Sequence, residues 1–103
     1  MLKVYLLKMI DNDTTIYKIG YTKNSVEDRR KILQTGCPNE IQIVESFESE
    51  FSIKIETTLH NIYKHKRIHG EWFSLDLEDE INFKANCEKY HNIQKLINTP
   101  FSV

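Results

Sequence analysis

The alternation of apolar and polar positions predicts a β-hairpin at the start of the chain. Residues 4–10 are mostly apolar over the length of one strand, which we expect to be buried on both faces or nearly so. Residues 11–13 read Asp-Asn-Asp, a turn signal because these side chains hydrogen-bond nearby backbone groups and tolerate left-handed geometry. Residues 14–20 are rich in β-branched and aromatic residues, so the returning strand should lie there.

The second strand ends in an unusual combination of an aromatic residue, a lysine and a glycine. Alternation places Tyr17 and Ile19 on one face and Lys18 and Gly20 on the other. A glycine inside a strand often marks a bulge or a close approach to the backbone. A turn residue in an ordinary amphipathic hairpin would give the same pattern, so this strand end alone does not establish a function.

A helix and a third strand should follow. Asn24 or Ser25 is a candidate N-cap, because short polar side chains accept hydrogen bonds from first-turn amides. Gly36, with a proline two residues later, predicts that this helix ends at about Gln34. Residues 41–47 alternate again, which predicts the third strand.

Two more helices are predicted in the second half of the chain. The first opens at Glu50 or Ser52 and runs to about Lys66. Its apolar stripe consists of Phe51, Ile55, Leu59 and Ile62. After an extended segment at 71–75, Asp76 should cap a last helix over residues 77–97, followed by a tail at 98–103. The residues of this helix that we expect to dock on the sheet are Leu77, Ile81, Ile93 and Leu96.

Composition narrows the class of protein. With 103 residues, of which 40% are hydrophobic and 28% charged, the chain fits one small folded domain. It shows neither a membrane-spanning stretch nor a signal peptide, so we expect a cytoplasmic or nuclear protein with no membrane partner and no organic cofactor. Cys37 and Cys87 lie far apart and should be free thiols, and the histidines lack the spacing of a structural zinc site.

The net charge of −1 hides a patterned distribution of charges. Basic residues cluster at Lys18, Lys23, Arg29, Arg30 and Lys31, and again at Lys64, Lys66 and Arg67. Acidic residues concentrate at 45–50 and 76–80. Such patches are compatible with a phosphate-rich ligand and equally with ordinary solvated faces.

Each chemically interesting residue has an ordinary structural explanation when it is taken alone. Tyr5 and Tyr17, on paired strands, fit a packing role. Arg29 and Arg30 fit a solvated helix face, and Glu56 fits an exposed helix position. Their order is more informative, and it comprises residues 3–5 (Lys-Val-Tyr), 18–22 (Lys-Ile-Gly-Tyr-Thr), Arg29, Glu56 with His60, and 70–73 (Gly-Glu-Trp-Phe).

This order resembles that of the GIY-YIG nuclease superfamily, and most closely its branch of phage and viral T5orf172 or Mug113-like domains. Residues 3–5 stand at the Gly-Ile-Tyr element, and residues 18–20 stand at the Tyr-Ile-Gly element, in the Lys-Ile-Gly-x-Thr form common in the branch. Arg29 matches the helix arginine better than Arg30 does. The resemblance covers residues 3–75, and we expect those after Asp76 to lie outside it.

The resemblance implies an α+β fold in which a small antiparallel three-stranded sheet is flanked by helices. Residues 1–75 would form the nuclease-like core, and residues 76–103 would add a C-terminal helix and tail packed on the same domain. The high content of Asn, Ile and Lys suggests an AT-rich genome, such as that of a phage or virus.

The resemblance also implies hydrolysis of a DNA phosphodiester with one divalent ion, Mg²⁺ or Mn²⁺. Glu56 would hold the hydrated ion, because Mg²⁺ takes few protein ligands and keeps several waters. Arg29 would neutralise charge on the non-bridging oxygens. Tyr5 would orient or deprotonate the attacking water, which requires its pKa to fall from about 10, and Lys18 is placed to lower it.

Lys18 is also the main departure from the superfamily, which often has a tyrosine there. Either Lys18 substitutes by contacting phosphate and tuning Tyr5, which we favour, or Tyr17 is a core residue with no catalytic part. No residue matches the family's late asparagine. His60 and Glu71 are further auxiliary candidates beside Tyr17.

Two other functions remain open, namely a DNA-binding module that has lost turnover and a scaffold that contacts another protein. Beyond the catalytic group, the residues expected to contact DNA are Lys23, Arg30, Lys64, Lys66 and Arg67. Affinity that falls steeply with salt would favour the nucleic-acid functions. The sequence leaves the oligomeric state open, a homodimer included.

Overall fold

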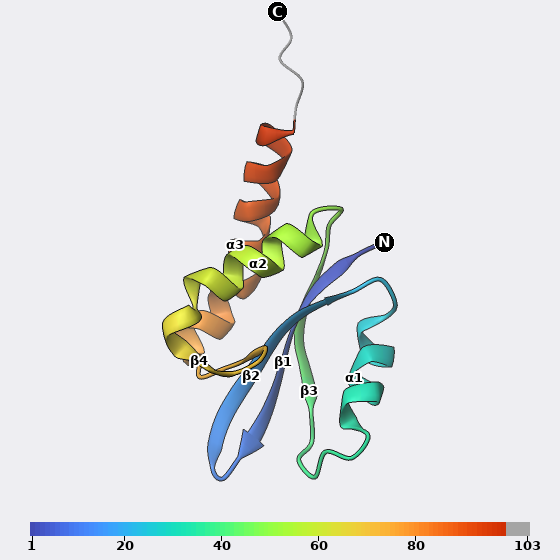
Figure 1. Ribbon diagram of the computed structural model, residues 1–103, viewed down its shortest axis with the longest axis vertical. Helices are drawn as coiled ribbons and strands as arrows, with labels where there is room; N and C mark the ends of the chain where they lie inside the picture. Colours follow the sequence, from blue (N-terminus) through green and yellow to red (C-terminus); the bar gives the residue numbers. More distant parts are fainter. Residues whose placement is uncertain (99–103) are drawn as a thin grey trace, which may run out of the picture.

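The computed structural model describes residues 1–98, so the predicted tail lies outside the described residues beyond Asn98. The fold is α+β, as predicted, with one antiparallel sheet and three helices (Figure 1). The elements are β1 (Lys3–Asp11), β2 (Thr14–Thr22), α1 (Val26–Gln34), β3 (Gln42–Glu48), α2 (Ser52–Ile62), the 3₁₀ turn η1 (Lys64–Lys66), β4 (Arg67–His69), β5 (Trp72–Phe73) and α3 (Leu77–Ile97). None of the helices within residues 1–98 is long and apolar enough to cross a membrane.

The sheet has five strands in the order β3-β1-β2-β5-β4, so the expectation of three strands is wrong. β4 and β5 have three and two residues, too few to show a period in the sequence. Gly70, with φ +55°, lies in the turn between them. β5 then pairs with β2, where Phe73 stands opposite Tyr17 and the Ile19 amide donates to the Glu71 carbonyl at 3.2 Å. The two extra strands therefore cover part of the outer edge of β2.

The predicted hairpin of β1 and β2 is confirmed. Asn12 and Asp13 have φ values of 50° and 65°, the left-handed pair that suits a two-residue hairpin turn. The register sets Tyr5 opposite Gly20. Burial on both faces holds only for residues 4–7, because Ile10 near the turn is 62% exposed.

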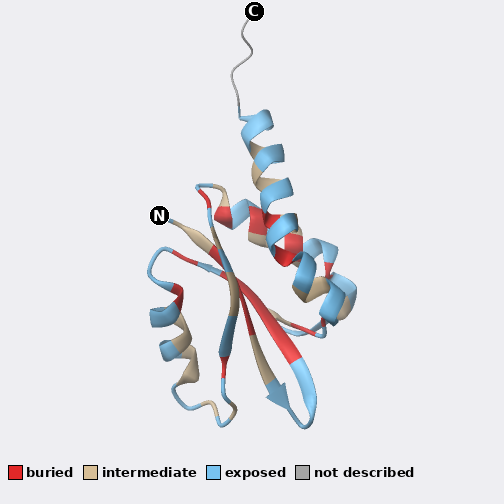
Figure 2. Ribbon diagram, turned by 180° about the vertical axis from the view of Figure 1, so that it is seen from behind, coloured by how far each residue is buried: buried red, intermediate tan, exposed pale blue. Residues whose placement is uncertain are grey.

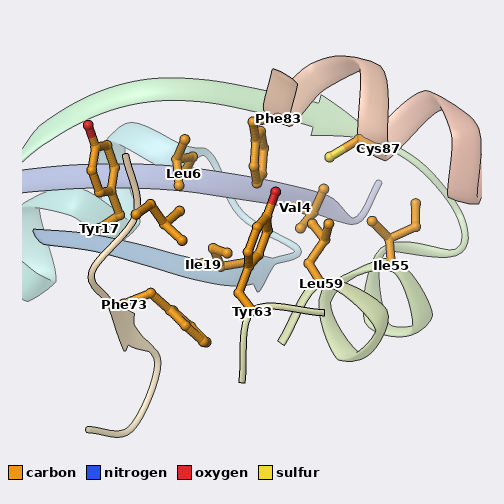
Figure 3. Close-up of a cluster of buried hydrophobic side chains, with 11 residues drawn as sticks. Val4, Leu6, Tyr17, Ile19, Ile55, Leu59, Tyr63, Phe73, Phe83 and Cys87 are labelled. Atoms are coloured by element: carbon orange, nitrogen blue, oxygen red, sulfur yellow. The ribbon is translucent and has the colours of Figure 1, made fainter. Parts of the chain in front are cut away.

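Helices cover the two faces of the sheet differently. α2 and α3 pack on one face, where side chains from both helices meet β1, β2 and β5 (Figures 1 and 3). The buried residues of this main core include Val4, Leu6, Tyr17, Ile19, Ile55, Leu59, Phe73, Phe83 and Cys87. α1 packs on the opposite face over a smaller cluster formed by Tyr5, Leu7, Val26 and Ile41. The residues at odd positions of β1 therefore face α1.

The predicted boundaries of α1 are confirmed. Ser25 is the N-cap, and its Oγ accepts a hydrogen bond from the Asp28 amide at 3.0 Å. The helix ends at Gln34, just before Gly36, which has φ +77°. α2 is shorter than expected, because it ends at Ile62 and continues as the 3₁₀ turn rather than as α-helix to residue 66.

The bounds of α3 are confirmed, with Asp76 as the N-cap of a capping box, but its predicted docking face is wrong. The four apolar residues expected to dock, Leu77, Ile81, Ile93 and Leu96, are 38% to 76% exposed. Phe83 and Cys87, one turn apart, are buried instead. The C-terminal part of α3 extends past the sheet, as Figure 2 shows, so its apolar residues have no sheet surface to meet.

Candidate active site

The site is built around a close contact between two paired strands. Tyr5 lies opposite Gly20, and a Cβ placed on Gly20 would lie 2.6 Å from Cζ of the Tyr5 ring. Real Cβ atoms do not approach other atoms so closely, so the ring lies against a backbone that only glycine leaves uncovered. The glycine in the strand therefore marks a close approach, which was one of the alternatives read from the sequence.

Arg29 reaches the Tyr5 hydroxyl from α1. The side chain of Arg29 hydrogen-bonds the Tyr5 hydroxyl. Tyr5 lies on the face of the sheet that α1 covers. Burial nevertheless raises the pKa of Tyr5, Arg29 opposes this effect, and the negative charges of Glu71 and Glu56 add to it. The expected fall of this pKa below about 10 is not found, because the effect of burial outweighs that of Arg29. Tyr5 therefore holds its proton at neutral pH.

Lys18 is engaged by a neighbouring carboxylate rather than open to solvent. It is 7% exposed, and its Nζ lies 3.0 Å from Oε1 of Glu71 and 5.7 Å from the ring centroid of Trp72. It is absent from the residues that line the hollow beside Tyr5. The expectation that Lys18 faces phosphate and tunes Tyr5 is therefore corrected, because its charge is directed at Glu71.

Glu56 points from α2 toward the outer edge of β2. Its side chain is 13% exposed, and the Tyr21 amide of β2 donates a hydrogen bond to the carboxylate. Burial raises the pKa of Glu56, and the nearby Glu71 carboxylate adds to the rise, while His60 and Lys18 oppose it. The carboxylate of Glu71 thus lies close enough to act on that of Glu56 at this edge.

His60, one helical turn after Glu56, binds the same strand edge. Its Nε2 lies 2.7 Å from the Ile19 carbonyl oxygen, and a carbonyl only accepts, so Nε2 carries the proton. Nδ1 lies 3.5 Å from Nη2 of Arg67. Nε2 also lies 3.9 Å from Oε1 of Glu56. His60 acts as a structural bridge from α2 to β2.

The predicted residues are only partly brought together. A hollow of about 370 Å³ opens beside Tyr5, and its lining consists of Tyr5, Tyr21, Thr22, Lys23, Asn24, Asp28, Arg29, Ile32, Glu56 and Glu71. Tyr5, Arg29, Glu56, Glu71 and Lys23 among these were singled out in the sequence. The lining residues that sequence reasoning missed lie at the end of β2, in the turn after β2 and on α1, and they are Tyr21, Thr22, Asn24, Asp28 and Ile32.

That turn has a sequence signal of its own. Thr22 is 8% exposed and its Oγ1 accepts a hydrogen bond from the Asn24 amide at 3.1 Å, which fixes the path from β2 to α1. The threonine is the last residue of the Lys-Ile-Gly-x-Thr pattern, so its position could have been inferred from that motif. Asn24 and Asp28 carried no comparable signal.

Three other predicted residues lie elsewhere. Tyr17 faces the main core, where its hydroxyl donates to Oε1 of Glu80 at 2.8 Å. Burial and this hydrogen bond raise the pKa of Tyr17 to about 12. Arg30 pairs with Glu27 of its own helix at 2.6 Å. An ion pair also engages Lys66, which lies 2.6 Å from Asp79 on α3. None of the three lines the hollow.

The donor chemistry of the hollow fits a hydrated Mg²⁺ or Mn²⁺ ion. Glu56 and Glu71 supply hard carboxylate oxygens, and Glu71 is close enough to raise the pKa of Glu56. Within residues 1–98, no group of three or more acidic, histidine or cysteine side chains is placed to form a complete protein cage. With these two carboxylates as its protein ligands, such an ion would keep several waters.

Comparison with known proteins identifies a family. A family model described as the T5orf172 domain matches residues 3–97. The match continues through α3 and thus exceeds residues 3–75, the part on which the sequence resemblance rests. No significant match was found among curated proteins or among solved structures.

Proposed function

Because the chain belongs to the T5orf172 family, which is associated with nucleases, we propose that it is a DNA endonuclease that hydrolyses phosphodiester bonds with one divalent ion, Mg²⁺ or Mn²⁺. One observation carries the proposal. Tyr5, Arg29 and Glu56 come from three different elements and line the same hollow. A phenol, a guanidinium and a carboxylate are the groups that water activation, charge neutralisation and cation binding require.

Arg29 and Tyr5 act on the phosphate and the water. The Arg29 guanidinium is always charged and carries donors in a planar fork, so it can neutralise the charge that builds on the non-bridging oxygens. Tyr5 has a raised pKa, which keeps its proton in place. Tyr5 therefore orients the attacking water through its hydroxyl, and the proton that the water loses on attack passes to the solvent in the open hollow.

Glu56, with Glu71 beside it, would hold the ion. When bound, the ion polarises the scissile phosphate and stabilises the leaving oxygen. The Tyr21 amide fixes the Glu56 carboxylate, and Lys18 fixes that of Glu71 at 3.0 Å. Lys18 is thus a positioning residue, because it acts through Glu71 and does not line the hollow.

A DNA-binding module without turnover is the second candidate. Two observations favour it, namely the raised pKa of Tyr5 and the engagement of Lys18 by Glu71. Such a module would keep the basic residues around the hollow and bind DNA with a strong dependence on salt. A protein-interaction scaffold would instead show no salt-sensitive DNA complex.

The decisive experiment is plasmid nicking by the wild type and by Glu56→Gln, with Mg²⁺, with Mn²⁺ and with EDTA. We expect nicking that needs the ion and that Glu56→Gln lowers by at least about a hundredfold, since the variant keeps the shape of the side chain but loses its charge. Glu88→Gln removes the same charge from an exposed position on α3 and should nick like the wild type.

The results separate the candidates. Equal nicking by the wild type and Glu56→Gln would remove Glu56 from the proposed ion site. Salt-dependent DNA binding without nicking under any condition would favour the module without turnover. Neither binding nor nicking would favour the protein-interaction scaffold.

A further inference from the structure

A second hollow shares Glu56 with the first one. It has a volume of about 380 Å³ and lies over α2, η1 and β4 rather than over α1. Its lining consists of Glu56, Thr57, His60, Asn61, Lys64 and Arg67. Because Glu56 lines both hollows, the two are neighbours at this residue.

Arg67 is held on a rigid platform at this hollow. Its Cζ lies 5.4 Å from the ring centroid of Phe73, which is fully buried, and its Nη2 lies 3.5 Å from Nδ1 of His60. His60 is itself fixed by the 2.7 Å hydrogen bond to Ile19. A guanidinium has five N–H donors, and the contact with His60 engages only Nη2. The remaining donors lie on an exposed residue and are oriented before any ligand arrives.

The positive charge at this hollow is available for a ligand. Lys64 and Arg67 form no ion pair with a carboxylate anywhere in residues 1–98. Arg30 and Lys66, by contrast, are neutralised by acids of their own surroundings. Among the basic residues predicted to bind DNA, those with uncompensated charge are thus the ones that line the two hollows. Positively charged side chains therefore line each of the two hollows that share Glu56.

We propose that the second hollow binds a backbone phosphate of the DNA strand, next to the phosphate that is cleaved at Glu56. Arg67 supplies the pre-oriented planar donors, and Lys64 supplies a flexible point charge. This inference rests on the proposed function and deepens it, because it gives the course of the bound strand. The strand passes from Lys23 and Arg29, across Glu56, to Arg67.

The test measures binding of a short fluorescein-labelled DNA duplex by anisotropy in EDTA, where no ion supports cleavage. The Lys64→Ala/Arg67→Ala variant should bind roughly tenfold or more weakly, and the slope of log affinity against log salt should fall by about 1 to 2. The matched control is Lys84→Ala/Lys89→Ala, which removes two charges from exposed positions on α3. It should change affinity by less than about twofold.

Two single variants guard against a disturbed fold. Arg67→Lys keeps the charge but lacks the planar fork, so its affinity should lie between those of the wild type and the double variant. Lys64→Ala removes an exposed side chain and should lower affinity without changing the thermal midpoint. In cleavage assays with Mg²⁺, Arg67→Lys and Lys64→Ala should each raise KM while kcat stays close to that of the wild type. Neither Lys64 nor Arg67 lines the hollow beside Tyr5.

The outcomes distinguish this inference from the proposed function. If the wild type binds and nicks DNA while the hollow variants bind like the control, the second hollow is not a phosphate site and the proposed function stands. If the wild type neither binds DNA at low salt nor nicks it, the proposed function fails and the phosphate site fails with it. Loss of affinity without a change in salt slope would also contradict a phosphate contact.

Discussion

At the scale of residues, the geometry of the candidate site depends on how closely the Tyr5 ring approaches Gly20. Tyr5 is 1% exposed, and its ring packs between β2 and α1. Its hydroxyl is thereby held beside Arg29 and at the hollow that Glu56 lines. A single methyl group at the glycine would disturb all of these relations.

We predict that Gly20→Ala displaces the Tyr5 ring and lowers nicking by roughly tenfold to a hundredfold, because a small misplacement of a reacting group has a large effect on rate. Overpacking of this kind typically costs about 1–3 kcal/mol in the free energy of unfolding. Urea titration and plasmid nicking measure the two effects. Ser46→Ala, at the exposed β3 position opposite Tyr5, is the control. Wild-type nicking by Gly20→Ala would show that the contact does not set the geometry.

A second prediction concerns the free energy of unfolding, which the buried charge of Glu56 lowers at neutral pH. Its pKa in the folded protein lies above the ordinary value of 4.5, mainly because of burial. Between these two values the folded protein binds more protons than the unfolded chain, so stability falls as pH rises through this interval. Glu56→Gln should therefore melt at a higher temperature than the wild type at pH 7. The difference should shrink near pH 4, where the carboxyl group is protonated in both states.

Thermal melts at the two pH values check this prediction. Each kcal/mol moves the midpoint by about 4–8 °C in a domain of this size, so even a partial effect is measurable. Glu88→Gln, at an exposed position of α3, should show no comparable gain at either pH. A lower midpoint for Glu56→Gln at pH 7 would show that the interactions that favour the charged carboxylate outweigh the cost of its burial.

At the scale of elements, the pairing of the two-residue strand β5 with β2 brings Glu71 next to Lys18. β5 pairs with β2, and the Ile19 amide donates to the Glu71 carbonyl directly before it. The same residue, Glu71, directs its carboxylate to Lys18. The backbone of Glu71 therefore binds the edge of β2, and its side chain lines the hollow.

We predict that Lys18→Met, which keeps an apolar stem of similar length, releases the Glu71 carboxylate and lowers nicking by about tenfold. The Ile19 amide should also exchange faster with solvent, because its acceptor belongs to Glu71. Lys18→Arg keeps the charge and should lose less. Hydrogen exchange and nicking measure the two effects. Unchanged values in Lys18→Met would show that Lys18 does not position Glu71.

At the scale of the whole molecule, the main core and the pair Tyr5–Arg29 lie on opposite faces of the sheet. The main core lies between the sheet and α2 with α3 (Figures 1 and 3). Tyr5 and its partner Arg29 lie on the face that α1 covers. Glu56 joins the two, since α2 buries Ile55 in the core and presents the next residue at the edge of β2. Site variants on the α1 face therefore leave the main core intact.

Local rules in the sequence were sufficient for the hairpin, for α1 and for the bounds of α3. The turn residues Asn12 and Asp13, the N-cap Ser25 and the capping box at Asp76 each act over a few neighbouring residues. The strands β4 and β5 could not be predicted in this way. Their two or three residues become strands only because the edge of β2 supplies hydrogen-bond partners.

The sequence by itself determined the order of the motifs from residues 3–5 to residues 70–73, and the resemblance that this order carries is confirmed by the family match over residues 3–97. The partner of Lys18 was decided only by the tertiary structure. An ion pair depends on the distance between charges, and Lys18 and Glu71 are brought to 3.0 Å by strand pairing rather than by proximity in the chain. The uncompensated charge of Arg67 depends in the same way on which acids the fold places elsewhere.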